Sequence, residues 1–300
     1  MDTSIRLRAF AKINLGLRVV APRPDGYHEI RTVMQTVDLC DRMEIRLKRR
    51  YRTVDVLCHA PEGEAVPGGR GNLVYRACEA WRRRRGWRSG IEILLQKRIP
   101  AGSGLGGASS DAWVTLAGLE RLTGERLPTE EALLPLAEEL GSDVPYFHWG
   151  GRALALGRGE EVYPLPDLPS RHCLISFPGE GFPSAEAYRQ ASLKLTAKRG
   201  KNRMEDGRGR PPFSLEKWGV VENDFEAVVF ARRPKVGRVK KLLTAAGAEP
   251  ASLSGSGTAV YGIFRDSQTL QQALDRLPRG WRAFQTQTLS RAAYQKRLVV

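Results

Sequence analysis

The sequence predicts an α+β fold in two parts, and three observations support this prediction. The chain has 300 residues, enough for roughly two domains of about 150 residues each. Strand-like and helix-like segments are mixed along it, without the regular strand–helix–strand alternation of a doubly wound sheet. A stretch rich in glycine and proline, residues 150–169, separates the two halves. We therefore expect an N-terminal lobe over residues 1–155 and a C-terminal lobe over residues 156–300.

Short apolar runs with partial alternation predict the strands of the first half. They are residues 5–10, 15–20, 32–39, 43–47, 53–57 and 91–95. The sequence PRPDGY at residues 22–27 contains the proline, aspartate and glycine typical of a tight turn. We therefore expect the chain to turn between the second and third of these runs.

Helical spacing of the apolar residues predicts three helices in the same half. They are residues 72–84, 108–122 and 130–140. Asn72 and Thr129 are the residue types that cap a first helical turn, and Gly141 is typical of a helix end.

The second half mixes strands and helices in the same way. The predicted strands are residues 152–156, 172–177, 259–264 and 282–288. The predicted helices are residues 185–193, 223–230, 236–246 and 267–277. Residues 194–210 are basic and nearly free of apolar side chains, which predicts a mobile loop.

The net charge favours an anionic partner. The chain carries 48 Lys and Arg against 33 Asp and Glu, a net charge of +15 at pH 7. Nucleic acid, acidic lipid and phosphorylated small molecules all fit a field of this sign. The sequence lacks the interleaved aromatic and basic residues of an RNA-recognition motif. No apolar run approaches the length of about 18 residues that a membrane span needs, so we expect neither a nucleic-acid nor a membrane partner.

Cysteine and histidine usage predicts a reducing compartment. The cysteines form no CxxC pair, and the four histidines have no metal-ligand spacing. The cysteines are Cys40, Cys58, Cys78 and Cys173. We expect free thiols, and we expect any metal to bind oxygen ligands. The first ten residues, MDTSIRLRAF, lack the long apolar run of a secretory signal, so we expect a cytoplasmic protein.

Residues 100–111, PAGSGLGGASSD, predict an anion-binding loop. They hold four glycines and three serines directly before a predicted helix. Glycines let the backbone approach phosphate oxygens closely, and the helix N-terminus adds unpaired N–H donors and a partial positive charge. The hydroxyls of Ser109 and Ser110 can add donors or an oxygen ligand for Mg²⁺.

Three other interpretations fit this segment less well. Gly102, Gly104 and Gly107 match the G-x-G-x-x-G pattern of dinucleotide sites, but no strand ending in an acid follows the helix. A Walker A loop needs Gly-Lys-Ser/Thr at its end, and this segment has no lysine there. A merely flexible linker seldom ends in a Ser-Ser-Asp helix start.

PAGSGLGGASSDA resembles the ATP-phosphate loop of the GHMP small-molecule kinases. AFAKINLGLRV at residues 9–19 and RPDGYHEI at residues 23–30 are similar to blocks of one branch of that superfamily, the 4-diphosphocytidyl-2-C-methyl-D-erythritol kinases. Four later blocks also match: LGSDVPYF at 140–147, PGEGFPSAEAY at 178–188, ENDFE at 222–226 and SLSGSG at 252–257. Because the matches run in order over nearly the whole chain, the chain is identified as a member of this family.

The resemblance implies a two-lobed GHMP kinase fold with the active site in the cleft between the lobes. It implies transfer of the ATP γ-phosphoryl group, with Mg²⁺, to the 2-hydroxyl of 4-diphosphocytidyl-2-C-methyl-D-erythritol in the non-mevalonate isoprenoid pathway. The alternative is another GHMP kinase, acting on a mevalonate-like acid, homoserine or a sugar; RPDGYH and GLGGASS argue against it. The implied partners are the two small molecules, and the chain is expected to be a monomer or a weak homodimer.

The resemblance implies that Lys12 and Asp143 are catalytic. A carboxylate at position 143 can orient or deprotonate the attacking hydroxyl. An ammonium at position 12 can lower the pKa of that hydroxyl and neutralise charge on the phosphoryl oxygens. Only folding can bring two residues so distant in sequence together.

The positions that match the family's ATP site are the glycine-rich segment and two residues around adenosine. They are Pro100, Ala101, Gly102, Ser103, Gly104, Leu105, Gly106, Gly107, Ala108, Ser109 and Ser110, with Asn72 and Lys97. The resemblance assigns no metal ligands, and Asn72 has the alternative role of a helix cap alone.

The positions that match the acceptor site lie in four separate blocks. They are Asn14, Tyr27, His28, Ser184, Gly255 and Gly257. Tyr27 is expected to stack on the cytosine ring, and His28 to bond its polar edge or a phosphate. Asn14 is two residues beyond Lys12, hence on the same face of a strand, and is expected to hold the erythritol. A simple helix cap at position 184 and a tight turn at the two glycines stay open as alternatives.

Overall fold

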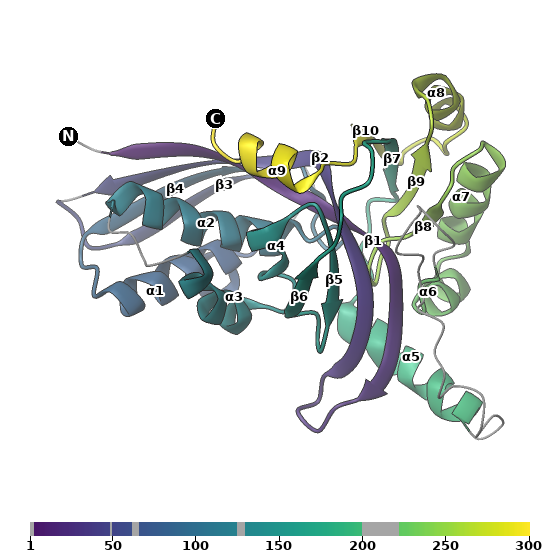
Figure 1. Cartoon of the computed structure of the whole chain (residues 1–300), viewed down its shortest axis with the longest axis horizontal. Coiled ribbons are helices and arrows are strands. Elements are labelled where there is room, and N and C mark those ends of the chain that lie inside the picture. Colours follow the sequence, from purple (N-terminus) through teal and green to yellow (C-terminus); the bar gives the residue numbers. More distant parts are fainter. Residues whose placement is uncertain (1–2, 49, 62–65, 125–129, 200–221) are drawn as a thin grey trace.

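The computed structural model describes residues 3–48, 50–61, 66–124, 130–199 and 222–300. Two β-sheets with associated helices make up this part of the chain, which confirms the predicted α+β class (Figure 1). The first sheet has the order β3-β4-β2-β5-β6, with β1 paired to β2, and the second has the order β10-β7-β9-β8. The strands are β1 (Ser4–Pro22), β2 (His28–Lys48), β3 (Val54–His59), β4 (Gly90–Gln96), β5 (Arg152–Leu156), β6 (Glu161–Pro164), β7 (His172–Phe177), β8 (Ala251–Leu253), β9 (Val260–Phe264) and β10 (Arg282–Gln287). The predicted lobe boundary and oligomeric state stay predictions.

A long antiparallel pair, β1 and β2, organises the first sheet. The two strands pair along nearly their whole length, with irregularities between Phe10 and Ala11 and between Asn14 and Gly16. Strand β2 also pairs with β5 through its first half and with β4 through its second half. The sequence predicted four short strands here, whereas the structure has two long ones, because bulges absorb the breaks in the alternation.

Helices occupy the intervals between the strands. They are α1 (Leu73–Arg85), α2 (Gly107–Thr123), α3 (Leu134–Leu140), α4 (Tyr146–Trp149), α5 (Ser184–Arg199), α6 (Glu226–Arg232), α7 (Pro234–Ala245), α8 (Ser267–Asp275) and α9 (Arg291–Arg297), with 3-10 turns at η1 (Gly69–Gly71) and η2 (Glu130–Leu133). In α1 the buried Ala77 and Trp81 are four residues apart and so lie on one face. The side chain of Asn72 accepts a hydrogen bond from the Val74 N–H, which confirms the predicted cap, and Gly86 ends the helix with φ of 64°.

Three apolar clusters form the core. The first fills the space between the first sheet and helices α1, α2 and α3. The second lies between the second sheet and helices α5 to α8. The third joins the two sheets: Ile13 of β1 and Val37 of β2 belong to the same cluster as Ile175 of β7 and Tyr261 of β9. Both faces of the second sheet are therefore covered, which explains why every residue of β9 is buried.

The C-terminal helix returns to the first sheet, where α9 lies beside β1 and β2 (Figure 1). Tyr294 of α9 is fully buried and meets the Phe10 ring edge-on, with 5.8 Å between ring centroids. Its hydroxyl donates to the Phe147 carbonyl of α4. Beyond the helix, Val299 bridges to Leu7 of β1. The sequence prediction contained neither α9 nor α4.

Other predicted elements differ in extent. Residues 130–140 form the 3-10 turn η2 followed by α3 instead of one helix, and Thr129 lies outside the described residues. Helix α5 continues to Arg199, so the loop prediction for residues 194–210 is wrong over residues 194–199. Residues 200–210 lie outside the described part of the chain. Strands β6 and β8 were also not predicted, because each is too short to show a period.

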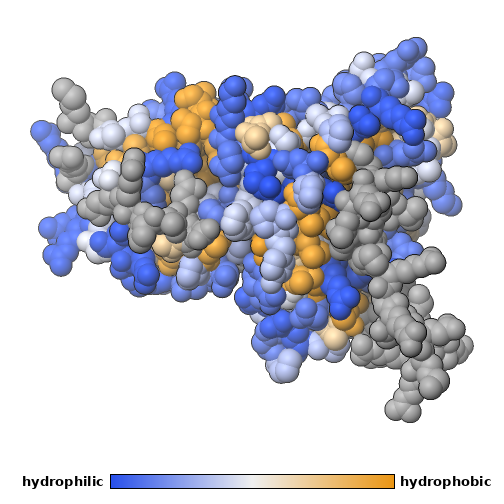
Figure 2. Space-filling model, viewed as in Figure 1, coloured by the Kyte–Doolittle hydropathy of each residue, from blue (hydrophilic) through white to orange (hydrophobic). Residues whose placement is uncertain are grey.

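Surface and cysteines agree with the composition. Most of the face shown in Figure 2 is hydrophilic, with apolar residues gathered in a patch and a central strip. All four cysteines are free thiols, as predicted, and three of them are buried. Within the described ranges, no helix combines the length and apolarity that crossing a bilayer requires.

Replacing Tyr294 by alanine should destabilise the fold, because the change removes the buried ring that attaches α9 to β1 and α4. We expect the free energy of unfolding in urea to fall by about 3–5 kcal/mol. Tyr163→Ala is the control, since that ring is 51% exposed and should cost less than about 0.5 kcal/mol. Equal losses in the two variants would contradict this account of the C-terminal helix.

Candidate active site

The larger cavity near the predicted site has a volume of about 830 Å³ and lies where β1, the β1–β2 turn, α5 and two glycine-containing turns meet. Ten predicted site residues line it, two of them glycines of the glycine-rich loop (residues 100–110). They are Lys12, Asn14, Tyr27, His28, Asp143, Ser184, Gly255, Ser109, Gly104 and Gly106. Folding therefore gathers residues from six separate segments around one hollow.

Lys12 and Asp143 meet in this cavity. Lys12 is only 3% exposed, and its Nζ lies 3.3 Å from Oδ2 of Asp143. Asp143 lies in the turn between α3 and α4, and its side chain is 36% exposed. A buried ammonium thus faces a carboxylate that solvent or a ligand can reach.

Asn14 fixes the lysine from the other side. Its Oδ1 accepts from Lys12 Nζ at 2.6 Å, and its Nδ2 donates to the Thr32 hydroxyl at 2.8 Å. The Thr32 hydroxyl donates in turn to the Gly16 carbonyl. Lys12 and Asn14 lie on one face of β1, as predicted. The hydrogen bonds through Asn14 and Thr32 set the direction of the Lys12 ammonium.

The glycine-rich loop connects β4 to α2, and its glycines are needed where other parts of the chain approach. Gly104 and Gly106 have φ of 82° and 72°, a region that other residues seldom adopt. A Cβ on Gly104 would lie 2.0 Å from the Ser254 carbonyl oxygen, and one on Gly106 would lie 2.9 Å from Lys12 Cγ. The loop therefore packs directly against the catalytic candidate Lys12 and against the turn at residues 254–257.

A second, smaller cavity of about 450 Å³ lies along the same loop. It is lined by Asn72, Lys97, Asp111 and the loop residues from Pro100 to Ser109. Gly104, Gly106 and Ser109 line both cavities. The loop and the N-terminus of α2 are thus a shared wall between two hollows, with backbone N–H groups available for an anion.

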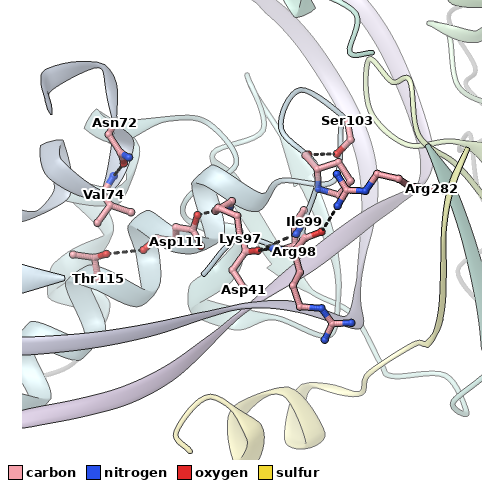
Figure 3. A network of polar contacts seen from close by, with 11 residues as sticks. Asp41, Asn72, Val74, Lys97, Arg98, Ile99, Ser103, Asp111, Thr115 and Arg282 are labelled. Atoms are coloured by element: carbon pink, nitrogen blue, oxygen red, sulfur yellow. Dashed lines mark hydrogen bonds and ion pairs between the residues drawn. The ribbon is translucent and has the colours of Figure 1, made fainter. Parts of the chain in front are cut away.

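Lys97 occupies a buried ionic cluster beside this second cavity (Figure 3). Its Nζ donates to Asp41 and, at 2.6 Å, to Asp111. Asp41 Oδ1 also accepts from the backbone N–H groups of Arg98 and Ile99. The sequence prediction placed Lys97 beside adenosine. In the structure Lys97 lines the smaller cavity, and its ammonium binds two carboxylates.

The cluster shifts its own protonation equilibria. Burial raises the pKa of Asp111 to about 7; Lys97 opposes this shift and the nearby Asp41 carboxylate adds to it. Burial alone would lower the pKa of Lys97, but the Asp111 and Asp41 carboxylates raise it. Lys97 therefore stays charged, and the two acids compete for it. Neither Asp41 nor Asp111 was among the predicted site residues, although Asp111 is the last residue of the predicted anion-binding segment 100–111.

Aromatic residues also line the larger cavity. Tyr27 is 53% exposed at the β1–β2 turn, and the Arg158 guanidinium lies 4.9 Å from its ring centroid. The His28 ring stacks on Tyr188 of α5 at 5.2 Å and 19°, and burial lowers the pKa of His28. Arg158 and Tyr188 were not predicted; the only sequence sign of Tyr188 is its place at the end of PGEGFPSAEAY.

Three further predicted residues were placed as follows. The Ser184 hydroxyl pairs with the Ser256 hydroxyl at 2.8 Å. Ser110 is fully buried and lines neither of the two cavities. Gly257 also lies outside both linings, and a Cβ there would meet Leu253 Cδ1 at 2.8 Å. The tight-turn alternative therefore describes Gly257 better than ligand contact does, whereas Gly255 faces the larger cavity.

Comparison with known proteins agrees with this arrangement. The model of the GHMP kinases N terminal domain matches residues 72–151, and that of the GHMP kinases C terminal domain matches residues 215–283. A 4-diphosphocytidyl-2-C-methyl-D-erythritol kinase of Solibacter usitatus is 42% identical, over 90% of this chain and 84% of that protein. One from Geobacter sp. strain M21 is 38% identical, over 95% of this chain and 99% of that protein.

Solved structures show the same relationship. A 4-(cytidine 5'-diphospho)-2C-methyl-D-erythritol kinase superposes with a TM-score of 0.72 and 32% identity, covering 95% of this chain and 99% of that one. A homoserine kinase from Cytophaga hutchinsonii has a TM-score of 0.68 at 21% identity, over 96% and 95% of the two chains, and shares the fold. The chain thus has the GHMP kinase fold, and by its sequence identity it belongs to the 4-diphosphocytidyl-2-C-methyl-D-erythritol kinase family of ATP-dependent small-molecule kinases.

Proposed function

We propose that this chain transfers the γ-phosphoryl group of ATP to the 2-hydroxyl of 4-diphosphocytidyl-2-C-methyl-D-erythritol. The observation that carries the proposal is the shared wall: one glycine-rich loop lines two cavities and contacts Lys12, which pairs with Asp143. ATP occupies the smaller cavity, with its phosphates on the loop, and the acceptor occupies the larger one. The names of the relatives supply the acceptor.

Lys12 and Asp143 carry the chemistry in this proposal. Asp143 accepts a hydrogen bond from the acceptor hydroxyl, orients it toward the γ-phosphorus and takes its proton. The new O–P bond forms as the bond between the γ-phosphorus and the bridging oxygen of ADP breaks, and ADP leaves. Lys12, held by Asn14, neutralises charge on the transferring phosphoryl oxygens. Phosphoryl transfer needs little covalent chemistry from the protein, so positioning and these charges account for most of the rate.

A hydroxyl oxygen of the loop fits a nucleotide-bound Mg²⁺. Among the residues that the structure describes, no group of three or more His, Cys, Asp or Glu side chains could hold a metal. Mg²⁺ usually takes only one or two protein oxygens together with phosphates and water. The Ser109 hydroxyl, which lines both cavities, would hold it. When bound, the ion neutralises phosphate charge.

The aromatic residues that line the larger cavity bind the cytosine ring in this proposal. Tyr27 offers an exposed ring face, and Arg158 fixes the ring in place. His28 supplies ring nitrogens for the polar edge of the base or a phosphate. The reaction belongs to isoprenoid precursor synthesis in the cytoplasm, and the free cysteines fit a reducing compartment.

Asp143→Asn should lower kcat by about 10²–10⁴-fold, because the amide can orient the hydroxyl but cannot accept its proton. The measurement is ADP release coupled to formation of the 2-phosphate product, with ATP affinity measured separately by calorimetry. We expect ATP affinity to change little. Asp275→Asn, on the exposed surface of α8, is the matched control. A wild-type protein that binds ATP but phosphorylates no acceptor would refute the function, and a fully active Asp143→Asn variant would remove Asp143 from the mechanism.

Tyr27→Ala should raise KM for the cytidine acceptor and leave KM for ATP nearly unchanged. Loss of a stacked base costs roughly 1–3 kcal/mol, so KM should rise by roughly 5- to 150-fold. Tyr51→Ala is the control, since Tyr51 is also exposed but lines neither cavity. A rise confined to KM for ATP would contradict the assignment of the two cavities.

A further inference from the structure

Residues 222–226, ENDFE, connect the strand that carries Lys12 to the second sheet. The Leu17 N–H donates to the Glu222 carbonyl at 2.9 Å, and the Asp224 N–H donates back to the Leu17 carbonyl at 3.0 Å. The Asp224 carboxylate accepts from the Val19 N–H at 2.8 Å. This segment is therefore fixed along β1, five to seven residues beyond Lys12.

Asn223, in the middle of the segment, extends this attachment to the serine–glycine turn (residues 254–257). It is 5% exposed. Its Nδ2 donates to the carbonyls of Leu253 and Gly255, both at 2.9 Å, and its Oδ1 accepts from the Phe225 N–H at 3.0 Å. Both amide donors and the amide oxygen are thus used, and a buried carbonyl that loses such a donor is left unsatisfied.

The serine–glycine turn in turn supports the glycine-rich loop. The Ser254 hydroxyl donates to the Gly104 carbonyl at 2.9 Å, and the Ala259 N–H donates to the Ser103 carbonyl at 3.0 Å. Gly104 has no room for a Cβ against the Ser254 carbonyl. A shift of the turn would therefore move Gly104, which lines both cavities.

We propose that Asn223 is a positioning residue for phosphoryl transfer: by holding Gly255 it sets the glycine-rich loop relative to Lys12. The expected change in kcat rests on the proposed function, whereas the positioning of the loop by Asn223 does not. Asn223 contacts neither cavity, so it acts through the turn. Glu226 holds the same strand end differently, since it accepts from the Ser252 hydroxyl and the Leu253 N–H but makes no bond to residues 254–257.

The experiment compares Asn223→Ala with the matched control Glu226→Gln. Misplacement of a reacting group by about 1 Å can lower the rate by about 10²-fold. We therefore expect Asn223→Ala to lower kcat by roughly 10- to 100-fold when it is assayed well below the melting temperature of the variant. Glu226→Gln should lower kcat by less than about threefold, even if its melting temperature is similar to that of Asn223→Ala. Asn223→Ser, which keeps one short donor, replaces the alanine variant if that variant fails to fold.

Amide hydrogen exchange provides a readout that does not depend on turnover. We expect Asn223→Ala or Asn223→Ser to raise exchange at residues 254–256 and 103–106 by at least about tenfold. Glu226→Gln should raise it only at residues 251–253. Unchanged exchange at residues 103–106, a kcat within about twofold of wild type, or equal kcat losses in both variants would each overturn the proposal. If the wild type transfers no phosphoryl group, the proposed function fails alone and the exchange comparison still decides the role of Asn223.

Discussion

The ammonium of Lys97 joins the two ends of the glycine-rich loop, and the geometry of both cavities depends on that connection. Asp41 of β2 binds Lys97 and the N–H groups of Arg98 and Ile99, where the loop begins. Asp111, near the start of α2 and directly after the loop, binds the same ammonium. A loop rich in glycine has much conformational freedom to lose, and this buried ion cluster limits it at both ends.

The middle of the loop is fixed by contacts that glycine alone allows. Gly104 lies against the Ser254 carbonyl and Gly106 against the Lys12 side chain, so one loop contacts the second sheet and the β1 strand. The apolar cluster shared by β1, β2, β7 and β9 fixes the position of the second sheet relative to β1. Proteins keep reacting groups within narrow limits by such packing, and here two residues of the cluster, Ile99 and Leu105, line the smaller cavity.

Much of this could be predicted from sequence, and the failures have physical causes. Strands β5 and β7 were predicted with their observed bounds, because tertiary contacts do not oppose their local pattern. Strand β1 was predicted as two pieces, because Lys12 and Asn14 interrupt its apolar run; they are buried polar residues that line a cavity. Strand β2 was predicted as two pieces because the buried Asp41 interrupts its apolar run. Family motifs gave Lys12, Asp143 and the loop. The motif blocks contain Tyr188 and Asn223 but gave them no role, and no block contains Asp41. The partners of all three lie in distant segments that only the fold brings together.

The two buried lysines of the site show how charge distinguishes support from chemistry. Lys97 is shared by two carboxylates, so its cluster has an excess of negative charge, and Asp111 relieves part of it through a raised pKa. Because both carboxylates already bind this ammonium, the cluster offers no unshared positive charge to a phosphate, and it suits a structural role behind the loop. Lys12 faces one carboxylate, Asp143, and the neutral Asn14. In the proposed reaction Asp143 takes up the hydroxyl proton, so Lys12 loses its counter-charge at the moment when charge shifts onto the phosphoryl group. An ammonium already fixed in place then stabilises that charge without reorganisation. Lys12 can act in this way because it faces one carboxylate, whereas Lys97 is bound by two.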